Sequence, residues 1–303
     1  MKIVEPQVEL WKQEPTLEGA WHQIARATRV CYQSKPRKGE SDEAFVNRVI
    51  LKPATREDGS IDFDKCHGAM LEHGTIYLTI PKTYFVARTI HYIHNKYSKV
   101  LFDDLFHDNN NTYITTNMRV ILENNWKDDL RFICTPDLHI KRTTFSVITD
   151  IGVTRELNRH RVNSIAEQST RYCTYSADKF GNEITYTSNS PFLECVSDGK
   201  TYFHELCKNI ANNNYKSIWD AKHYHVFGLL AAEFAYLGLK KNKIHNDMAR
   251  QVLNLNTRSQ AVYTAFDDDW KHFIKLRADN VSGKVHPNMK IIADKIKELF
   301  NNK

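Results

Sequence analysis

The stretch RELNRHRVNSIAEQSTRYCTYS, Arg155 to Ser176, carries four arginines and one histidine but no lysine up to Arg171. A guanidinium group pairs bidentately with phosphate or carboxylate, whereas the lysine ammonium is a compact, strongly hydrated point charge. The all-arginine choice therefore indicates an anion held in a defined geometry. The arginines could equally be surface residues paired with nearby acids such as Glu156 and Glu167, and charge alone leaves both interpretations open.

The surrounding sequence places this stretch between regular elements. A run rich in β-branched residues predicts a strand from about Thr143 to Ile148, followed by a short helix from about Thr154. On that helix Arg155 and Arg159 are expected one turn apart on one face, while Arg161 projects elsewhere. More than one anionic group is therefore implied. The residues after the helix supply small polar groups and backbone amides that can cradle a phosphate or a base edge, namely Ser164, Glu167, Gln168, Ser169 and Thr170.

The composition describes an ordinary globular chain. Its 303 residues are 41% hydrophobic, which is enough to bury a substantial core. The formal charge of +6 is too diffuse for a nucleic-acid footprint, so a small anionic ligand is the better match. No internal repeat, low-complexity tract or long flexible linker divides the sequence. A single domain with insertions is the simplest organisation.

The sequence also predicts where the chain works. No apolar run approaches the length of a membrane span, so no membrane partner is expected. The first residues, MKIVEPQVELWKQEP, lack the basic, apolar and small-residue regions of a secretory signal. A cytoplasmic protein is therefore expected.

The cysteines and histidines give no metal or redox motif. The six cysteines contain no C-x-x-C pair, and buried free thiols are expected. The pairs His91/His94 and His223/His225 could ligate a metal in principle, but neither belongs to a recognised ligand framework, and no metal site is predicted. Cys173 lies beside the arginines and could be a nucleophile, although no histidine base has a recognisable spacing to it.

Periodicity predicts a mixed α and β chain. Strands are expected at Thr75–Ile80 and around Thr143. The long apolar run Tyr224–Leu239 predicts a buried helix. The other predicted helices share a 3.6-residue pattern and cover Thr16–Arg29, Thr115–Asn125, Tyr202–Ala221, Asn246–Leu255 and a closing amphipathic segment within His286–Phe300.

The segment RHRVNSIAEQSTRY closely resembles the signature of the flavin-dependent thymidylate synthases. That signature has Arg-His-Arg, seven residues, a Ser preceded two positions earlier by Glu, and Arg-Tyr after it. The resemblance extends over most of the chain, in the family's order: MKIVEPQVEL, RATRVCY, LEHGTIYLTI, TTNMR, ARQVLNLNT, FIKLRAD and HPNM each resemble a family segment.

The resemblance implies a specific reaction. Such enzymes methylate dUMP at C5, with methylenetetrahydrofolate as carbon donor, NADPH as reductant and FAD as the hydride carrier between them. Cysteine-dependent thymidylate synthases attack the base with a thiolate, whereas this family is understood to use no protein nucleophile. Cys173 then needs no catalytic role, and the protein's task is to bind, orient and polarise.

The resemblance also implies roles for individual residues. The catalytic residue would be Arg277, which matches the arginine thought to activate uracil by favouring the charged form of N3. The dUMP pocket would be lined by Glu156, Arg159, Glu167, Gln168, Ser169, Thr170, Arg171, Arg250 and Arg277. FAD would be contacted by His73, Arg159, His160, Arg161, Glu167 and His272.

Several positions depart from the family pattern. Glu156 replaces a glutamine, and an ionised carboxylate cannot donate to a uracil carbonyl. Asn254 replaces the proline of a Leu-Pro element, and Ala166 replaces a frequent asparagine. The flavin-contacting residues of some members align with Phe266, Asp268 and His272, of which His272 could keep a ring contact.

The resulting expectation is one α+β domain over residues 1–303, with a mainly antiparallel sheet flanked by helices. Insertions are expected around 35–65, 90–115 and 280–285. The family further implies a homotetramer with sites shared between subunits. The alternatives are a family variant that modifies C5 of dUMP differently, and a nucleotide-binding or RNA-binding protein without catalysis.

Overall fold

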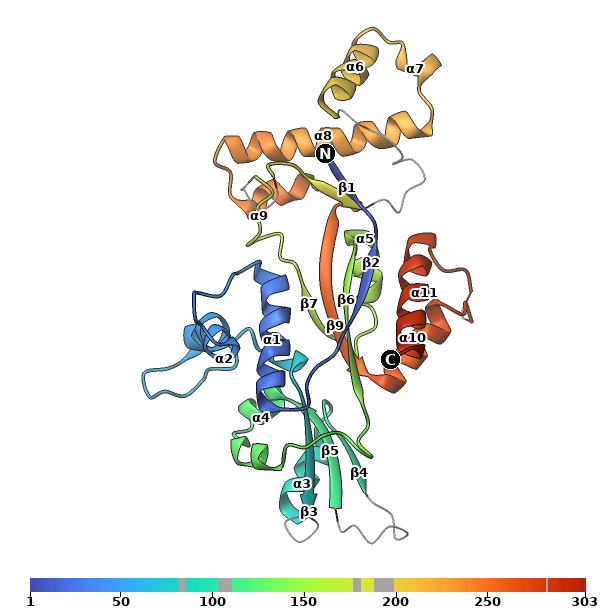
Figure 1. The fold of residues 1–303 in the computed structure, drawn as a ribbon. Helices are drawn as coiled ribbons and strands as arrows, with labels where there is room; N and C mark the ends of the chain where they lie inside the picture. Colours follow the sequence, from blue (N-terminus) through green and yellow to red (C-terminus); the bar gives the residue numbers. More distant parts are fainter. Residues whose placement is uncertain (82–85, 103–110, 177–180, 188–198, 282) are drawn as a thin grey trace.

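The computed structural model describes residues 1–81, 86–102, 111–176, 181–187, 199–281 and 283–303 (Figure 1). The strands are β1 (Lys2–Val4), β2 (Gln7–Trp11), β3 (Thr75–Pro81), β4 (Lys99–Phe102), β5 (Asn111–Asn117), β6 (Arg142–Asp150), β7 (Ser164–Glu167), β8 (Thr185–Thr187) and β9 (Arg258–Phe266).

The helices are α1 (Leu17–Tyr32), α2 (Asp42–Val46), α3 (Val86–His94), α4 (Met118–Glu123), α5 (Ile151–Leu157), α6 (Gly199–Ala211), α7 (Tyr215–Ile218), α8 (Ala221–Lys241), α9 (Asn246–Ala249), α10 (Asp267–Arg277) and α11 (Pro287–Asn301). Short 3-10 turns occupy Lys52–Ala54, Gly68–His73, Lys127–Phe132 and Arg250–Val252, and a π-helical turn occupies Asn47–Leu51.

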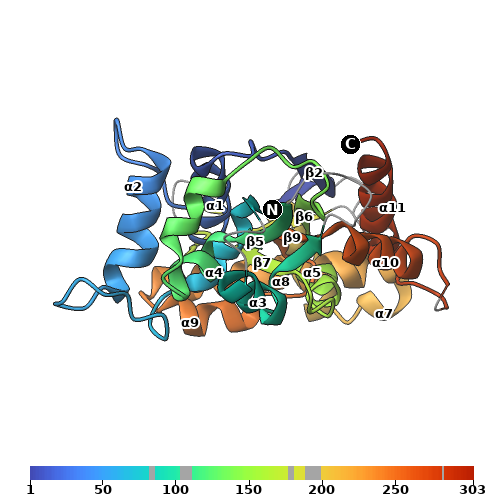
Figure 2. The same cartoon turned by 90° about the horizontal axis from the view of Figure 1, so that it is seen from below.

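The centre of the chain is an antiparallel sheet with the strand order β2-β6-β9-β7. Strands β6 and β9 pair along nine residues, from Arg142 opposite Phe266 to Asp150 opposite Arg258. Alternate residues of β9 face opposite sides of the sheet, as the two-residue period of a strand requires. Val262 packs in the core shared with α1, whereas Ala261 and Tyr263 pack in the core shared with α10 and α11. Figure 2 shows the same division, with α1 and α10–α11 on opposite sides of the strands.

Two smaller sheets complete the fold. Strands β3, β5 and β4 form an antiparallel sheet in that order, and β1 pairs in parallel with β8. The α+β class with antiparallel sheets flanked by helices is confirmed, although the strands form three sheets. The division into one domain with insertions stays a prediction, and residues 103–110 and 282 of those segments lie outside the described residues.

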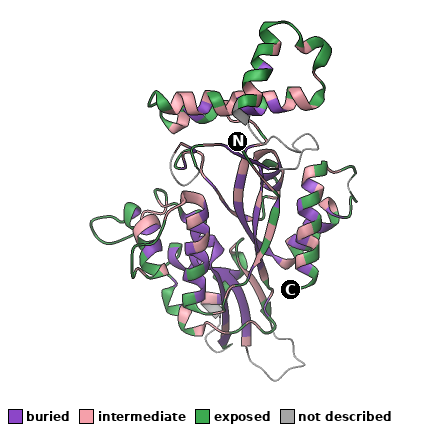
Figure 3. Ribbon diagram, turned by 45° about the horizontal axis from the view of Figure 1, so that its top comes forward, coloured by how far each residue is buried: buried purple, intermediate pink, exposed green. Residues whose placement is uncertain are grey.

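The burial predicted for the helix at Tyr224–Leu239 is wrong for much of its surface. Helix α8 forms as expected, but its buried residues are Val226, Leu229, Leu230 and Tyr236. Phe234 is 69% exposed, although the helix is apolar on most sides. Figure 3 shows α8 and α6 as mostly exposed or intermediate, in contrast to the buried central strands. The apolar run correctly predicts a helix, but the burial of that helix depends on which elements pack against it.

Several other helix predictions have the wrong boundaries. The one at Asn246–Leu255 forms α9 only as far as Ala249 and continues as the 3-10 turn Arg250–Val252. Thr115 and Thr116 belong to β5, and the helix begins only after Asn117, whose side chain accepts a hydrogen bond from the Val120 N–H at 3.1 Å. The predicted helix Tyr202–Ala221 is interrupted near Asn213, which has a φ of 57° in the left-handed region. The chain therefore ends α6 at Ala211 and starts α7 at Tyr215.

Among the described residues, none of the helices combines the length and the apolarity that a crossing of a lipid bilayer would need.

Candidate functional site

Helix α5 is the element on which the arginine stretch depends. Strand β6 ends at Asp150, whose side chain caps the helix by accepting a hydrogen bond from the Val153 N–H at 2.7 Å. The helix ends at Leu157, and Asn158 follows as its C-cap. Arg155 is therefore in the last turn, and Arg159 lies beyond the helix end. The prediction that both share one helix face is wrong, because the helix stops two residues before Arg159.

A cavity of about 710 Å³ lies beside α5. Five residues predicted for nucleotide binding line it together: Glu167, Gln168, Ser169, Thr170 and Arg250. Arg155 also lines it, a contact that the sequence prediction missed. The other lining residues are Cys31, Ile151, Gln251, Leu253, Asn254, Leu255 and Ser259. The volume falls within the range typical of small-molecule sites, roughly 300–1,000 Å³.

Glu167 joins three elements at the wall of this cavity. Its carboxylate accepts hydrogen bonds from the hydroxyls of Thr154, at 2.7 Å, and Ser259, at 2.8 Å. The Asn158 side-chain amide donates a third bond at 3.1 Å. These donors belong to α5, its C-cap and β9. Glu167 therefore fixes α5 against the sheet.

Gln168 is held by a half-buried arginine. Its side chain is 4% exposed, and its Oε1 accepts a hydrogen bond from Arg258 at 2.7 Å. Its backbone N–H donates to the Gln260 carbonyl at 2.8 Å. Burial lowers the pKa of Arg258. The side chain of Gln168 is thus set by β9 before any ligand arrives.

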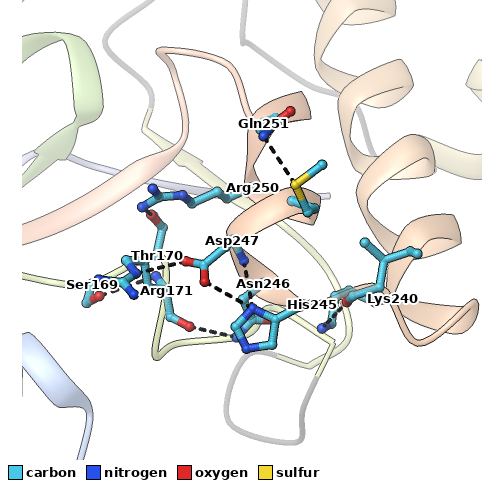
Figure 4. A network of polar contacts seen from close by, with 11 residues as sticks. Ser169, Thr170, Arg171, Lys240, His245, Asn246, Asp247, Arg250 and Gln251 are labelled. Carbon is cyan, nitrogen blue, oxygen red and sulfur yellow. Dashed lines mark hydrogen bonds and ion pairs between the residues drawn. The ribbon is translucent and has the colours of Figure 1, made fainter.

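Residues Ser169 to Arg171 form a turn at the edge of the cavity. The Ser169 N–H donates to the Cys31 carbonyl of α1 at 3.0 Å. The Thr170 hydroxyl accepts a hydrogen bond from Arg250 Nη1 at 3.4 Å, and Arg171 Nε donates to Asp247 at 2.8 Å (Figure 4). The turn therefore lies between α1 and the segment that carries Arg250.

A second cluster consists of Glu156 on α5, His160 just after α5, and Arg277. Arg277, in the last turn of α10, donates from Nε to His160 Nε2 at 3.3 Å and lies 3.7 Å from the carboxylate of Glu156. Burial, with Arg277 and then His272, lowers the pKa of His160 to about 4. A neutral imidazole that accepts at Nε2 carries its proton on Nδ1. These contacts bring together three predicted site residues, but none of them lines the 710 Å³ cavity.

Three more predicted flavin ligands are exposed near this cluster: Arg159, Arg161 and His272. His272 is close enough to His160 to lower its pKa. Within the part of the chain that the structure describes, the side chains of Arg159 and Arg161 have no ion-pair partner, which answers the alternative of ordinary surface pairing for these two.

His73 lies in the core instead. Its side chain is fully buried, with Nδ1 2.8 Å from the Thr264 hydroxyl. Burial, followed by the nearby cation of Arg142, lowers its pKa to about 3. The structure places His73 in neither cluster, and its role as a flavin ligand stays a prediction.

The family model described as "Thymidylate synthase complementing protein" matches residues 138–303, more than half of the chain. The chain belongs to this family. The match runs from just before β6 to the last residue, so it contains α5, Arg250 and Arg277. The family expected from the signature RHRVNSIAEQSTRY is confirmed.

Solved structures of two relatives are similar to this member of the thymidylate synthase complementing family. Thymidylate Synthase X from Helicobacter pylori, solved with FAD and dUMP, is 15% identical with a TM-score of 0.38, over 97% of this chain and 92% of that one. The UMP/dUMP methylase PolB from Streptomyces cacaoi, bound with 5-Br UMP, is 14% identical with a TM-score of 0.41, over 100% and 92%. A search among curated proteins found no match.

The two cysteines nearest the candidate site are not placed as nucleophiles. Cys173 is buried, and Cys31 lines the cavity with a pKa that burial raises to about 12. Such a thiol is a poor nucleophile at neutral pH. Cys207 is exposed, contrary to the expectation of buried thiols, and Cys195 lies outside the described residues.

The histidine pairs have ordinary structural contacts. His223 caps α8 through its hydrogen bonds with Asp220, and His91 packs against the ring of Trp126. Over the residues that the structure covers, no group of three or more metal-binding side chains comes together.

Proposed function

We propose that this chain catalyses the FAD-dependent reductive methylation of dUMP to dTMP, with methylenetetrahydrofolate as carbon donor and NADPH as reductant. The observation that carries the proposal is the cavity that gathers Glu167, Gln168, Ser169, Thr170 and Arg250 in a chain of the thymidylate synthase complementing family. Membership of this family supports dUMP as the substrate, while NADPH and methylenetetrahydrofolate are part of the proposal.

The cavity offers groups that suit a nucleoside monophosphate. Arg155 and Arg250 are exposed cations on two of its walls, and a guanidinium matches the geometry of a phosphate. Ser169 and Thr170 add hydroxyls at the same edge. Arg171 is expected to join them when the nucleotide binds. Cys31, Leu253 and Leu255 provide apolar surface against which a base could lie.

The second cluster fits the phosphates of FAD. Arg159 and Arg161 are exposed, lack ion-pair partners among the described residues and flank His160. Two free guanidiniums next to a neutral imidazole suit a diphosphate and a polar ring edge. FAD bound there would supply the hydride transfer between reductant and nucleotide. His272 and Glu167 would complete the set, the latter by holding α5 in place.

Arg277 would act on the base. Its guanidinium is 25% exposed and is oriented by His160 and, more loosely, by Glu156. A cation held in a water-poor site stabilises negative charge that develops on uracil N3 and C5. A carboxylate has no hydrogen to donate, so the proposed part of Glu156 is to orient Arg277 and not to donate to the base. Arg277 is thus the proposed catalytic residue.

We further propose the family's homotetramer, with each site shared between subunits. In one chain Arg277 does not line the cavity that contains Arg250. We propose that a complete site combines the two clusters from different chains. The apolar exposed surface of α8, including Phe234 and Tyr224, is available for contacts between copies.

Complementation tests the shared site. Tetramers mixed from Arg250→Ala and Arg277→Ala chains should regain activity that neither variant has alone, because some sites then combine both intact residues. The measurement is dTMP formation after the two purified variants are dissociated, mixed and reassociated. Mixed tetramers that stay as inactive as the parents would show that both arginines come from the same chain.

The cysteines should be dispensable for turnover. We expect Cys173→Ala and Cys31→Ala to retain dUMP methylation, because Cys173 is buried and burial raises the pKa of Cys31 to about 12. Activity is measured with matched flavin content, so that a folding defect is recognised by lost flavin. A covalent cysteine–dUMP adduct, or no turnover with normal flavin binding, would contradict this.

Flavin binding separates the enzyme from a nucleotide-binding or RNA-binding protein. The purified chain should take up FAD and show a flavin absorption spectrum, and an Arg159→Ala, Arg161→Ala double variant should take up less. Colourless protein that does not bind added FAD would remove the proposed function.

A further inference from the structure

The turn Ser169–Arg171 and the segment that carries Arg250 are joined by three polar contacts at the mouth of the cavity. Asn246 donates from its side-chain amide to the Arg171 carbonyl at 3.0 Å. Asp247 accepts from Arg171 Nε at 2.8 Å, and Arg250 donates to the Thr170 hydroxyl at 3.4 Å. Figure 4 shows Asp247 directed at Arg171 and Arg250 directed at Thr170. Residues 246–250 therefore bind the turn from one side through three hydrogen bonds.

Arg171 and Asp247 form an ion pair that is exposed to solvent. The Arg171 side chain is 55% exposed and the Asp247 side chain 40%. The hydrogen bond to Arg171 lowers the pKa of Asp247 and raises that of Arg171, so both groups are charged near neutral pH. An ion pair that is this open to water contributes little stability. It can be exchanged for a stronger partner.

The pair also turns Arg171 away from the cavity. Ser169, Thr170 and Arg250 line the cavity, whereas their neighbour Arg171 does not. Its Nε edge is occupied by Asp247, which lies on α9. A phosphate carries more charge than a carboxylate and offers more acceptor oxygens, so it competes well for the same guanidinium.

We propose that Asp247 is the resident counter-ion of Arg171, which it releases to the phosphate group of the bound nucleotide. The inference rests on the proposed function in one respect, that the nucleotide places its phosphate beside Arg250. After release, the Asp247 carboxylate would be hydrated, because its side chain is already 40% exposed. Asp247 thereby sets the affinity of the site as a competitor for Arg171.

The exchange predicts that removing the negative charge tightens phosphate binding. Asp247→Asn keeps the size of the side chain but weakens its hold on Arg171. We expect dUMP to bind about threefold more tightly to this variant in a calorimetric titration, as befits the loss of an exposed ion pair. Deoxyuridine, which has no phosphate, should bind with unchanged affinity. A side chain that only orients Arg171 would give weaker dUMP binding instead.

Two controls isolate the exchange. Asp128→Asn removes one exposed negative charge from the 3-10 turn Lys127–Phe132, which packs with β3 and α4 and does not line the cavity, and should leave dUMP affinity unchanged. In an Arg171→Ala background, Asp247→Asn should no longer tighten dUMP binding, because the competed group is missing. Unchanged or weaker dUMP binding by Asp247→Asn, or the same gain without Arg171, would overturn the proposal.

Inorganic phosphate separates this inference from the proposed function. If the native chain binds no dUMP, the proposed function fails, but tighter phosphate binding by Asp247→Asn would still support the exchange at Arg171. If dUMP binds and Asp247→Asn changes neither dUMP nor phosphate affinity, the exchange fails and the proposed function stands.

Discussion

Replacing Arg277 by alanine is expected to lower kcat for dUMP methylation about tenfold or more at saturating substrates, because a charged hydrogen-bond partner typically contributes about 1.5–3 kcal/mol. An interaction that forms as charge develops affects kcat, whereas one that is equal in the ground state affects mainly KM. Arg277 is held beside His160 and Glu156, ready for such a role. Single-turnover oxidation of the reduced flavin by dUMP and folate measures the effect.

The same variant has a second readout that does not depend on activity. The Arg277 cation is, after burial, the next cause of the low pKa of His160, about 4. Its removal should raise that pKa, which NMR titration of the imidazole can follow. Lys275→Ala, which alters an exposed cation on the same helix, is the matched control. An unchanged single-turnover rate in Arg277→Ala would leave that arginine as a binding contact at most.

Arg250→Ala is expected to weaken dUMP binding about tenfold or more, through loss of a charge-assisted contact to the phosphate. Its guanidinium lies at the cavity and contacts Thr170 across the mouth. The effect should appear in the dissociation constant of dUMP and be smaller for deoxyuridine. Arg37→Ala, an exposed arginine outside the site, should bind dUMP normally. A normal dissociation constant in Arg250→Ala would place the phosphate elsewhere.

The local elements of the fold could be predicted where the sequence carries its own signals. Thr16 was expected to open the first helix, and its hydroxyl accepts a hydrogen bond from the Gly19 N–H. The helix runs three residues beyond the predicted Arg29 and stops before Gln33, which has a left-handed φ of 50°. The β-branched run near Thr143 correctly predicted β6, which is two residues longer at its C-terminal end than expected.

Long-range contacts determined what the sequence could not show. Strand β7 is only four residues long and is a strand because it pairs with β9, about a hundred residues away. Helix α5 ends at Leu157, and the amide of its C-cap Asn158 donates to Glu167. Arg155 and Arg159 therefore lie on either side of the helix end, and neighbours in the signature contribute to two clusters. Residue types identified the candidate site, but only the folded chain shows which members meet.

The exposure of α8 also could not be predicted from the sequence. Its apolar composition predicted burial, yet Phe234 remains exposed in a single chain. A helix that is apolar on most sides needs a packing partner, but its sequence does not show which chain supplies that partner. The proposed tetramer would supply that partner and would also bring Arg277 of one chain to the cavity of another.

The most direct test of the proposed activity is the mass of the nucleotide after reaction. The purified chain is loaded with FAD and incubated with dUMP, NADPH and methylenetetrahydrofolate, with Arg277→Ala as the matched control. The account predicts that dUMP becomes heavier by one methylene unit and co-elutes with dTMP, and that the variant converts far less. Recovery of unchanged dUMP from flavin-loaded protein, or a product with a different group at C5, would contradict it.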